Sequence, residues 1–341
     1  MKSVAVIILN FNGREHLERF LPSVTRYSTP HKIIVADNGS TDDSITYLKS
    51  NYPEVQLLKF KENHGFCGGY NRAIEEVEAD YIILLNNDIE VTKNWIEPLI
   101  DKLDELDQSP TIFAVQPKVL SLRQPDSFEY AGAAGGYMDK LGYPFCRGRI
   151  FETLEKDLGQ YDDNRKIFWA TGACMAVRRD VYLELGGLDE DFFAHMEEID
   201  LCWRAQHQGY SIEYCFESTI YHLGGGTLGY NNPTKTYYNF RNNLFMLIKN
   251  MPTTLLVPTL IVRLLFDFAA AVKFLLEGSR KSFISVVKAY GSVLISLPKL
   301  IKKRKKVHHK EWPSSVIYSG SIAFDYYIQN KKYFEKLKFQ N

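Results

Sequence analysis

The sequence predicts an α/β protein with a mostly parallel central sheet, helices on both faces, and a C-terminal helical, amphipathic extension. Three observations support this prediction. Apolar runs of strand length alternate with amphipathic helical segments early in the chain, which is typical of a parallel sheet covered by helices. The 341 residues suffice for one large domain and an appendage. Beyond Pro252 the chain changes to apolar blocks with sparse, mostly basic charges.

The elements follow in order from the spacing of apolar residues. Val4 to Leu9 is a continuous apolar run that predicts a strand, and the apolar residues after it share one helix face up to Val24. The same alternation predicts strands at 33–36, 55–60 and 81–85 and helices at 42–48, 70–77 and 95–103. The later elements are strands at 112–119, 167–177 and 211–216 and helices at 197–208 and 235–249. We interpret the irregular part between 112 and 177 as the half that receives a second ligand.

Charge divides the chain near residue 250. Residues 1–250 carry 25 basic and 36 acidic residues, a net charge of −11, whereas residues 251–341 carry 16 and 5, a net charge of +11. The second part contains apolar blocks at 255–276 and 283–301, and a basic cluster follows them at 302–306. We therefore predict one large acidic domain over residues 1–250 and a basic, amphipathic helical region over 251–341.

The N-terminus and the apolar blocks give no sign of export or of an ordinary membrane span. The most apolar stretch, 253–276, is interrupted by Arg263, Asp267 and Lys273, so a spanning helix is not expected. The chain enters its first strand without the apolar segment and cleavage site of a signal peptide. Five cysteines include no Cys-x-x-Cys pair, which favours reduced thiols. The cytosolic side is the expected compartment.

Polar segments follow the predicted strands, at the edge where parallel sheets bind ligands. They are Asn10-Phe11-Asn12, Asp37-Asn38-Gly39-Ser40-Thr41-Asp42, Asn63-His64-Gly65-Phe66 and Asn86-Asn87-Asp88. Gly65, Gly68 and Gly69 would allow the backbone to approach a diphosphate closely. Their spacing does not fit a dinucleotide-binding fingerprint, which argues against a dehydrogenase.

Together with four later motifs, these segments resemble the family 2 glycosyltransferases of GT-A fold, and within them the rhamnosyltransferase-like enzymes of bacterial surface polysaccharide synthesis. The later motifs are Gly172-Ala173-Cys174-Met175, Gly186-Gly187-Leu188-Asp189-Glu190, Glu197-Glu198-Ile199-Asp200-Leu201-Cys202-Trp203-Arg204, and His222 followed by Gly224 to Thr227. The resemblance covers about residues 3–250. It implies a Rossmann-like catalytic domain over 1–250.

The resemblance implies a set of donor-binding residues and a divalent cation, Mg²⁺ or Mn²⁺. The donor-binding positions are Asn10, Phe11, Asp37, Asn63, Gly65, Asn71, Asn86 and Asn87. From the residues alone, Asp37 is equally a turn residue and Phe11 a core aromatic. Asp88 and His222 match the metal ligands. The family usually has Asp-x-Asp where this chain has Asn86-Asn87-Asp88, which leaves one carboxylate.

The resemblance also implies a general base in a pair of carboxylates at the start of a helix. Glu197 and Glu198 stand where the family has a Glu-Asp pair, and Glu198 matches the base. Acidic residues in a first helical turn are also favoured by the helix dipole. Trp169, Gly172 and Asp200 would line the acceptor side, although Trp169 is nearly as compatible with core packing.

The expected function is inverting transfer from a nucleotide-diphosphate sugar, dTDP-rhamnose being one candidate, to a glycan hydroxyl on a polyprenyl-linked acceptor. The alternatives are a nucleotidyltransferase and an inactive sugar-nucleotide-binding scaffold. The basic C-terminal region predicts association with an anionic membrane, on the cytoplasmic face of the inner membrane. A helical hairpin that packs on the catalytic domain or on another subunit is the alternative. Nucleic acid is not an expected partner, because aromatic residues do not alternate with the basic cluster.

Overall fold

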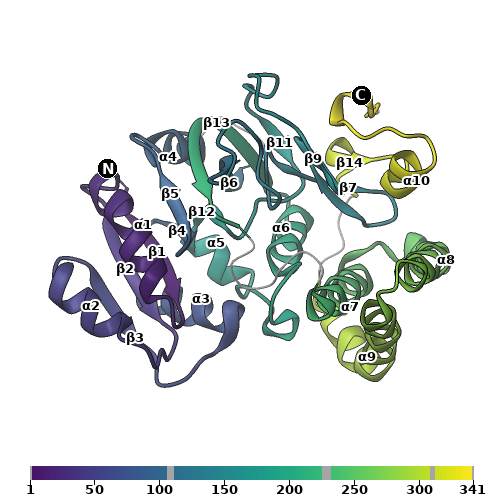
Figure 1. Ribbon diagram of the computed structural model, residues 1–341, viewed down its shortest axis with the longest axis horizontal. Coiled ribbons are helices and arrows are strands. Elements are labelled where there is room, and N and C mark those ends of the chain that lie inside the picture. Colours follow the sequence, from purple (N-terminus) through teal and green to yellow (C-terminus); the bar gives the residue numbers. More distant parts are fainter. Residues whose placement is uncertain (1, 106–110, 225–231, 308–311, 340–341) are drawn as a thin grey trace.

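Alternating residues of the first strand face opposite layers of helices. The computed structural model describes residues 2–105, 111–224, 232–307 and 312–339. In β1 (Val4–Asn10), Val6 and Ile8 pack into one hydrophobic core, whereas Ala5 and Ile7 pack into the other. One core is covered by α1 (Arg14–Tyr27), α2 (Ser44–Asn51) and α4 (Glu97–Asp104). The other is covered by α3 (Gly65–Glu76), α5 (Arg179–Glu184) and α6 (Glu197–His207) (Figure 1). The predicted α/β architecture with helices on both faces is confirmed.

The larger sheet joins a parallel half to a mixed half. Its further strands are β2 (Lys32–Asp37), β3 (Gln56–Lys59), β4 (Tyr81–Asn86), β5 (Ile89–Val91), β6 (Ile112–Ser121), β11 (Arg165–Ile167), β12 (Cys174–Arg178) and β13 (Ser211–His222). Within the described residues the order is β11-β13-β6-β12-β4-β1-β2-β3, with β5 paired to β13. Strands β3, β2, β1 and β4 are parallel, and β12 runs antiparallel to β4. The carboxyl ends of β1, β2 and β4 therefore meet the amino end of β12 at one edge.

Two predicted boundaries differ from the structure. Helix α3 begins at Gly65 instead of residue 70, so the glycines of this segment form its first turns. At Gly69 a Cβ atom would come within 2.6 Å of the Leu9 side chain, which explains why glycine allows the helix to approach the sheet. The strand predicted at 167–177 is divided into β11, at one end of the sheet, and β12, which lies between β6 and β4.

A second sheet joins the end of the chain to its middle. It has the order β10-β9-β8-β7-β14. Its strands are β7 (Gly136–Asp139), β8 (Pro144–Cys146), β9 (Arg149–Ile150), β10 (Thr153–Leu154) and β14 (Ile317–Tyr318). Strand β14 pairs in parallel with β7, and the short helix α10 (Ile322–Tyr327) follows it. The C-terminal region is thus helical only in part, because its last described residues return to the strands of residues 1–250 (Figure 1).

Three long helices lie side by side next to the second sheet (Figure 1), and one of them, α8, buries charged side chains while most of its large apolar ones are exposed. They are α7 (Pro233–Asn250), α8 (Thr253–Leu276) and α9 (Arg280–Arg304). On α8 the buried residues include Arg263 and Asp267, which form an ion pair at 3.3 Å. Asp267 also accepts hydrogen bonds from Tyr143 and Tyr290. The charged face of α8 therefore packs against the protein.

The inward position of these charges changes the expectation about membrane spans. By length and composition alone, α8 and α9 are both apolar enough to cross a membrane. We expected no ordinary span because Arg263 and Asp267 interrupt the apolar stretch. Charged residues in apolar helices commonly face a protein interior, as these two do, so their presence does not count against contact of α8 with lipid.

Candidate active site

Polar side chains at the carboxyl ends of β1, β2 and β4 form one hydrogen-bonded group. Asn10 donates to Asp37 Oδ2 at 3.2 Å, and Asn87 donates to Asn10 Oδ1 at 3.1 Å. Asp37 is fully buried and accepts a further bond from the backbone N–H of Ser40. In this structure Asp37 organises the loop after β2, so its contact with a donor stays a prediction. Phe11 is 46% exposed, which leaves its ring accessible for stacking.

A second group ties the loop after β2 to the start of α3. Asn38 donates to Asn63 Oδ1 at 3.0 Å and to the carbonyl of Gly65 at 2.9 Å. Asn63 in turn accepts from the backbone N–H of Gly65. Gly65 has a φ of +70°, a conformation that favours glycine. The structure thus joins the predicted positions Asn63 and Gly65 at the sheet edge, next to the Asp37 loop.

Asn71 does not face this edge, although it is predicted as a donor-binding residue. Its carbonyl oxygen accepts hydrogen bonds from Tyr182 and from the backbone N–H of Leu188, and its amide donates to the carbonyl of Leu188. Both ends of the side chain are therefore used to hold the segment after α5. Asn71 therefore has a structural role in this chain, and its contact with a donor stays a prediction.

Asp88, His222 and Glu129 form a buried row behind the sheet edge. His222 Nε2 lies 3.1 Å from Asp88 Oδ1, and Nδ1 lies 3.3 Å from Glu129 Oε2. Burial would lower the pKa of His222, but the two carboxylates outweigh it and raise the pKa to about 10. Burial would raise the pKa of Asp88, yet His222 holds it below its usual value. The imidazole therefore carries its proton between two anions, and a metal ion bound at Nε2 would replace the proton on that atom.

The geometry of Asp88 and His222 fits a divalent cation. Ligands at about 2.1 Å from an octahedral ion lie about 3.0 Å from their neighbours, and the two donor atoms are 3.1 Å apart. Within the described part of the chain, no group of three or more His, Cys, Asp and Glu side chains has ligand geometry. Magnesium sites are commonly built from one or two protein ligands completed by substrate phosphates. The residues present fit such a site.

The carboxylates of Glu197 and Glu198 begin α6. Burial, partly offset by nearby backbone N–H groups, raises the pKa of Glu198 to about 7, and burial with the neighbouring charge raises that of Glu197 well above its usual value. Oε2 of Glu198 has no hydrogen-bond partner among the described residues. A Cβ atom at Gly172 would lie 3.7 Å from Cβ of Glu198, so the two residues are adjacent. The carbonyl of Ala173, next in sequence, accepts from the backbone N–H of Asn86. This contact connects Glu198 to the end of β4 that is followed by Asp88.

The loop before α6 is strained and is held from α7. Phe193, His195 and Met196 all have positive φ values, 65°, 69° and 73°. Each such non-glycine residue costs on the order of 1–3 kcal/mol, which surrounding contacts must offset. The side-chain amide of Asn242 donates to three loop carbonyls at 2.7–2.9 Å. Arg241 donates to Asn242 Oδ1 and to the carbonyls of Asp191 and Phe192, the second of which Asn242 also contacts.

We expect Asn242→Ala to lower kcat about tenfold or more while leaving the KM of the sugar donor nearly unchanged, because the variant releases the loop that aims Glu198. Steady-state kinetics measures this difference between the two parameters. Asn242→Gln keeps the amide and should recover part of the loss. A matched change on the same helix, Asn239→Ala, should have little effect. Equal losses in kcat and in donor binding would assign Asn242 to general stability instead.

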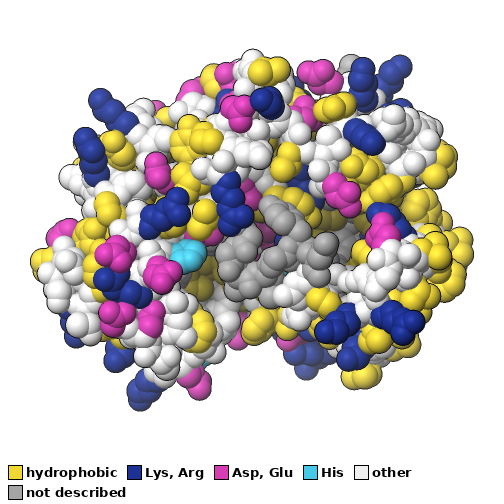
Figure 2. Space-filling view, viewed as in Figure 1, with side chains coloured by type: hydrophobic (Ala, Val, Ile, Leu, Met, Phe, Trp, Pro, Cys, Tyr) yellow, Lys and Arg dark blue, Asp and Glu magenta, His cyan; other side chains and the backbone are white. Residues whose placement is uncertain are grey.

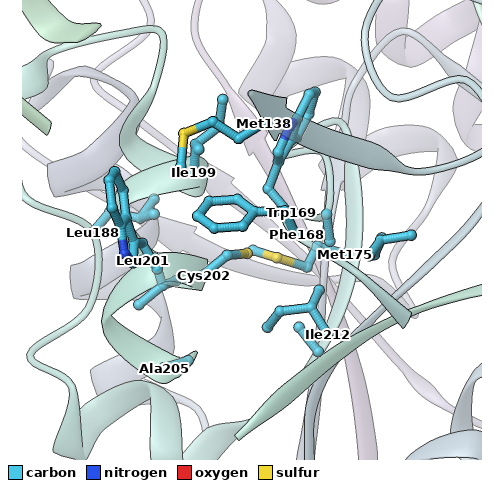
Figure 3. Packing of buried hydrophobic residues seen from close by; sticks show 14 of the residues in the cluster. Met138, Phe168, Trp169, Met175, Leu188, Ile199, Leu201, Cys202, Ala205 and Ile212 are labelled. Atoms are coloured by element: carbon cyan, nitrogen blue, oxygen red, sulfur yellow. The ribbon is translucent and has the colours of Figure 1, made fainter. Parts of the chain in front are cut away.

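Trp169 and Asp200, both predicted to line the acceptor site, are buried side chains with partners inside the protein. Trp169 is 5% exposed, donates to the carbonyl of Tyr137 and packs in the hydrophobic cluster shown in Figure 3. Asp200 is fully buried and bonds to Lys249 and Asn250. Both side chains are thus held by partners within the protein, and their contact with an acceptor stays a prediction. Gly172, by contrast, lies against Glu198.

The comparison with known families decides what kind of protein has this geometry. A family model described as glycosyl transferase family 2 matches residues 5–186, more than half of the chain. The chain belongs to glycosyltransferase family 2. This membership confirms the predicted family and enzyme class, and it sets aside the nucleotidyltransferase alternative.

Relatives of this family 2 glycosyltransferase support a rhamnosyltransferase-like protein of GT-A fold. An N-acetylglucosaminyl-diphospho-decaprenol L-rhamnosyltransferase of Mycobacterium tuberculosis is 29% identical over 236 residues, which cover 64% of this chain and 75% of that protein. TarS 1–349 of S. aureus, solved with UDP-GlcNAc, has a TM-score of 0.56 at 12% identity and covers 99% of this chain and 97% of its own. The mannosyltransferase PcManGT from Pyrobaculum calidifontis, solved with GDP-Man and Mn²⁺, has a TM-score of 0.52 at 13% identity, with 91% and 81% covered. The solved structures show the fold alone.

Sequence reasoning missed Glu129 and Asn242. Glu129 contacts His222 across 93 residues of sequence, and Asn242 reaches a loop about 50 residues earlier. No local pattern marks either position as part of the site. The one signal in the sequence is the pair of polar neighbours Arg241 and Asn242, which precede an apolar segment of the same helix.

Proposed function

We propose that this family 2 glycosyltransferase transfers a sugar, with inversion at the anomeric carbon, from a nucleotide-diphosphate sugar to a hydroxyl of a lipid-linked glycan in cell-surface polysaccharide synthesis. The observation that carries the proposal is the unpartnered Oε2 of Glu198 beside Gly172. The backbone contact of Ala173 with Asn86 connects this carboxylate to Asp88 and His222. A base and an anion-stabilising site thus occur together at the sheet edge where ligands bind in such folds.

The reaction is a direct displacement. Glu198 removes the proton of the acceptor hydroxyl at Oε2, the acceptor oxygen forms a bond to the anomeric carbon, and the bond from that carbon to the diphosphate breaks. The electron pair leaves with the nucleoside diphosphate. A divalent cation, when bound by Asp88 and His222, supplies positive charge to the leaving group. Asn10, Asp37 and Asn87 fix the loops around the nucleotide, and Phe11 stacks on its base.

The donor and acceptor classes rest on the relatives. The Mycobacterium tuberculosis relative is named for rhamnose transfer to a diphospho-decaprenol-linked sugar, and the TarS and PcManGT structures contain nucleotide sugars. We therefore propose a nucleotide-activated hexose or deoxyhexose, with dTDP-rhamnose as the first candidate. The acceptor is a polyprenyl-diphosphate-linked saccharide.

Thermal stabilisation by nucleotide sugars tests the donor proposal. The full chain is heated with a panel of UDP-, GDP- and dTDP-sugars, each with and without Mn²⁺. Binding to the folded state raises the unfolding temperature, and we expect one nucleotide class to do so only with the cation. The best donor is then tested for transfer to a lipid-linked saccharide. No stabilisation by any member of the panel would favour the inactive scaffold alternative.

The outward face of α8 and α9 supports membrane association on the cytoplasmic face of the inner membrane. Large apolar side chains there are 36–84% exposed, and they are Leu255, Val257, Ile261, Leu264, Leu265, Phe268, Leu275, Leu276, Ile284, Val287, Leu294, Ile295, Leu297 and Ile301. We call this set the outer apolar face. It gathers at the right edge of the molecule, over α8, with Lys and Arg side chains below (Figure 2). Exposed apolar area of this extent marks an interaction site.

Only part of the predicted basic cluster is available to lipid. Lys299 and Lys303 form ion pairs with Asp191, and Arg304 donates to the carbonyls at the end of α7. Lys302 and Lys305 are exposed. We therefore propose that α9 does both things that the sequence suggested. One side of the helix packs on the catalytic domain, and the other faces outward, where it can contact a membrane.

We expect the full chain to sediment with vesicles that contain anionic phospholipid, and the double variant Leu265→Glu/Phe268→Glu to remain largely in the supernatant. The variant replaces two exposed apolar side chains, which would be buried in the lipid, by charged ones that the lipid excludes. The control is Leu158→Glu, which alters a side chain that is 83% exposed on the catalytic half. If the unaltered chain stays soluble with vesicles at low salt, or if the control loses binding equally, the membrane proposal is wrong.

A further inference from the structure

A basic pocket lies between the first turns of α7 and of α9. Its cavity measures about 460 Å³, and its lining residues are Pro233, Thr234, Tyr237, Lys281, Ile284, Ser285 and Lys288. Two ammonium groups and three hydroxyls line it, and no carboxylate does. A larger cavity near Asp189, of about 860 Å³, is lined by acidic and basic residues together. The lining of the small pocket therefore favours an anion.

The two lysines of the pocket keep their charge for a ligand. Lys281 and Lys288 are two helical turns apart on one side of α9, both are exposed, and neither forms an ion pair within the described residues. Lys299 and Lys303, farther along the same helix, are paired with aspartates. Charge-assisted contacts to phosphate oxygens are the strong contacts that lysine makes.

The pocket adjoins the outer apolar face. Ile284 lines the pocket and is 48% exposed, and Val287, beside Lys288, is 56% exposed. A ligand whose anionic group lies in the pocket can thus place an attached apolar chain on this face. Inorganic anions and nucleotides lack such a chain, so the combination fits an isoprenoid diphosphate.

The pocket also lies next to the candidate active site. Tyr237 lines the pocket, and the following residue, Tyr238, stacks on Phe193 with ring centroids 5.5 Å apart. Phe193 belongs to the strained loop before Glu198 and packs over Gly65. A group attached to an anion in the pocket could therefore lie close to the loop that precedes Glu198.

We propose that this pocket binds the diphosphate of a prenyl-diphosphate-linked acceptor, with Lys281 and Lys288 as its cationic contacts and the isoprenoid chain along the outer apolar face. The inference rests on the proposed function, since it names the acceptor subsite of that reaction. Thr234 and Ser285 donate hydroxyl hydrogen bonds to the phosphate oxygens.

The test measures binding of farnesyl diphosphate to the full chain, with farnesol, inorganic diphosphate and phosphatidylglycerol vesicles as separate probes. Excess nucleoside diphosphate with Mn²⁺ occupies the donor site throughout. We expect Lys281→Glu/Lys288→Glu to weaken binding of farnesyl diphosphate about tenfold or more, because two charge-assisted contacts become repulsive. The control is Lys302→Glu/Lys305→Glu, which makes the same charge change at the other end of α9 and should alter binding less than twofold.

The outcomes separate this inference from the proposed function. Neutral Lys281→Gln/Lys288→Gln provides a second variant with a milder change, and an unaltered unfolding temperature shows that each variant folds. Equal binding by the pocket variant and the unaltered chain, an equal loss in the control, or farnesol binding as tightly as farnesyl diphosphate would overturn the inference. Preferred binding of phosphatidylglycerol would assign the pocket to bulk lipid and overturn it as well. If the pocket variants bind farnesyl diphosphate as the unaltered chain does, while Glu198→Gln still abolishes transfer, the inference fails and the proposed function stands.

Discussion

Glu198→Gln is expected to lower the rate of sugar transfer by about 10²–10⁴-fold, the contribution usual for a positioned general base. Glutamine keeps the size and hydrogen-bonding shape of the side chain but cannot accept the acceptor proton. Because Oε2 has no hydrogen-bond partner among the described residues, the substitution breaks no hydrogen bond of that atom there. Transfer is measured with saturating donor and acceptor, and donor binding by titration, which should remain at the level of the unaltered chain.

The pH dependence of transfer belongs to the same prediction. The pKa of Glu198 is raised to about 7 by burial, and the deprotonated carboxylate is the active form. We therefore expect kcat/KM to rise with pH through about 7 and to level off above it. An exposed control, Glu184→Gln on α5, should retain both the rate and the profile. Near-normal turnover by Glu198→Gln would end the assignment, and a larger loss in Glu197→Gln would move it to the neighbour.

The fold could be predicted because its signals are local. Strand β1 is a continuous apolar run followed by Asn10, and β4 is followed directly by Asn86 to Asp88, so the sequence alone places these polar groups at one sheet edge. The spacing of apolar residues also located α8 and α9 closely. Periodicity, however, does not state which face of a helix is buried. For α8 the inner face is the polar one, because Arg263 and Asp267 find partners on α7 and beyond β7.

Three of the predicted site residues make contacts within the protein that the sequence does not reveal. Asn71, Trp169 and Asp200 lie in matching motifs, yet each side chain is occupied by a partner far away in sequence. Asp200 follows Glu197 by three residues on α6 but faces Lys249, and the sequence gives no sign of that pairing. The position of a residue in a motif predicts where its backbone lies better than it predicts the contacts of a polar side chain.

Asp88→Ala is expected to lower kcat/KM on the order of 10²–10³-fold, as does removal of one group that stabilises charge in a transition state. Asp88 is the carboxylate that remains where the family usually has two, and it is 8% exposed with His222 at 3.1 Å. Its loss leaves His222 and Glu129 without the partner that orients the row. The residual activity should therefore no longer respond to Mn²⁺, which a titration of the cation measures directly.

The control for Asp88 is Glu90→Ala, an exposed acidic residue two positions later on β5, which should keep both the rate and the response to the cation. Glu129→Gln tests whether Glu129 acts by orienting the imidazole of His222 or by its negative charge. It keeps an acceptor near Nδ1 of His222, so we expect a higher Mn²⁺ concentration for half-maximal activity with only a modest fall in the maximal rate. If Asp88→Ala transferred sugar at the unaltered rate in a chelator, the leaving diphosphate would have to be stabilised by N–H groups and cationic side chains alone. The remaining single carboxylate of Asn86-Asn87-Asp88 would then be a structural partner of His222 and not a metal ligand.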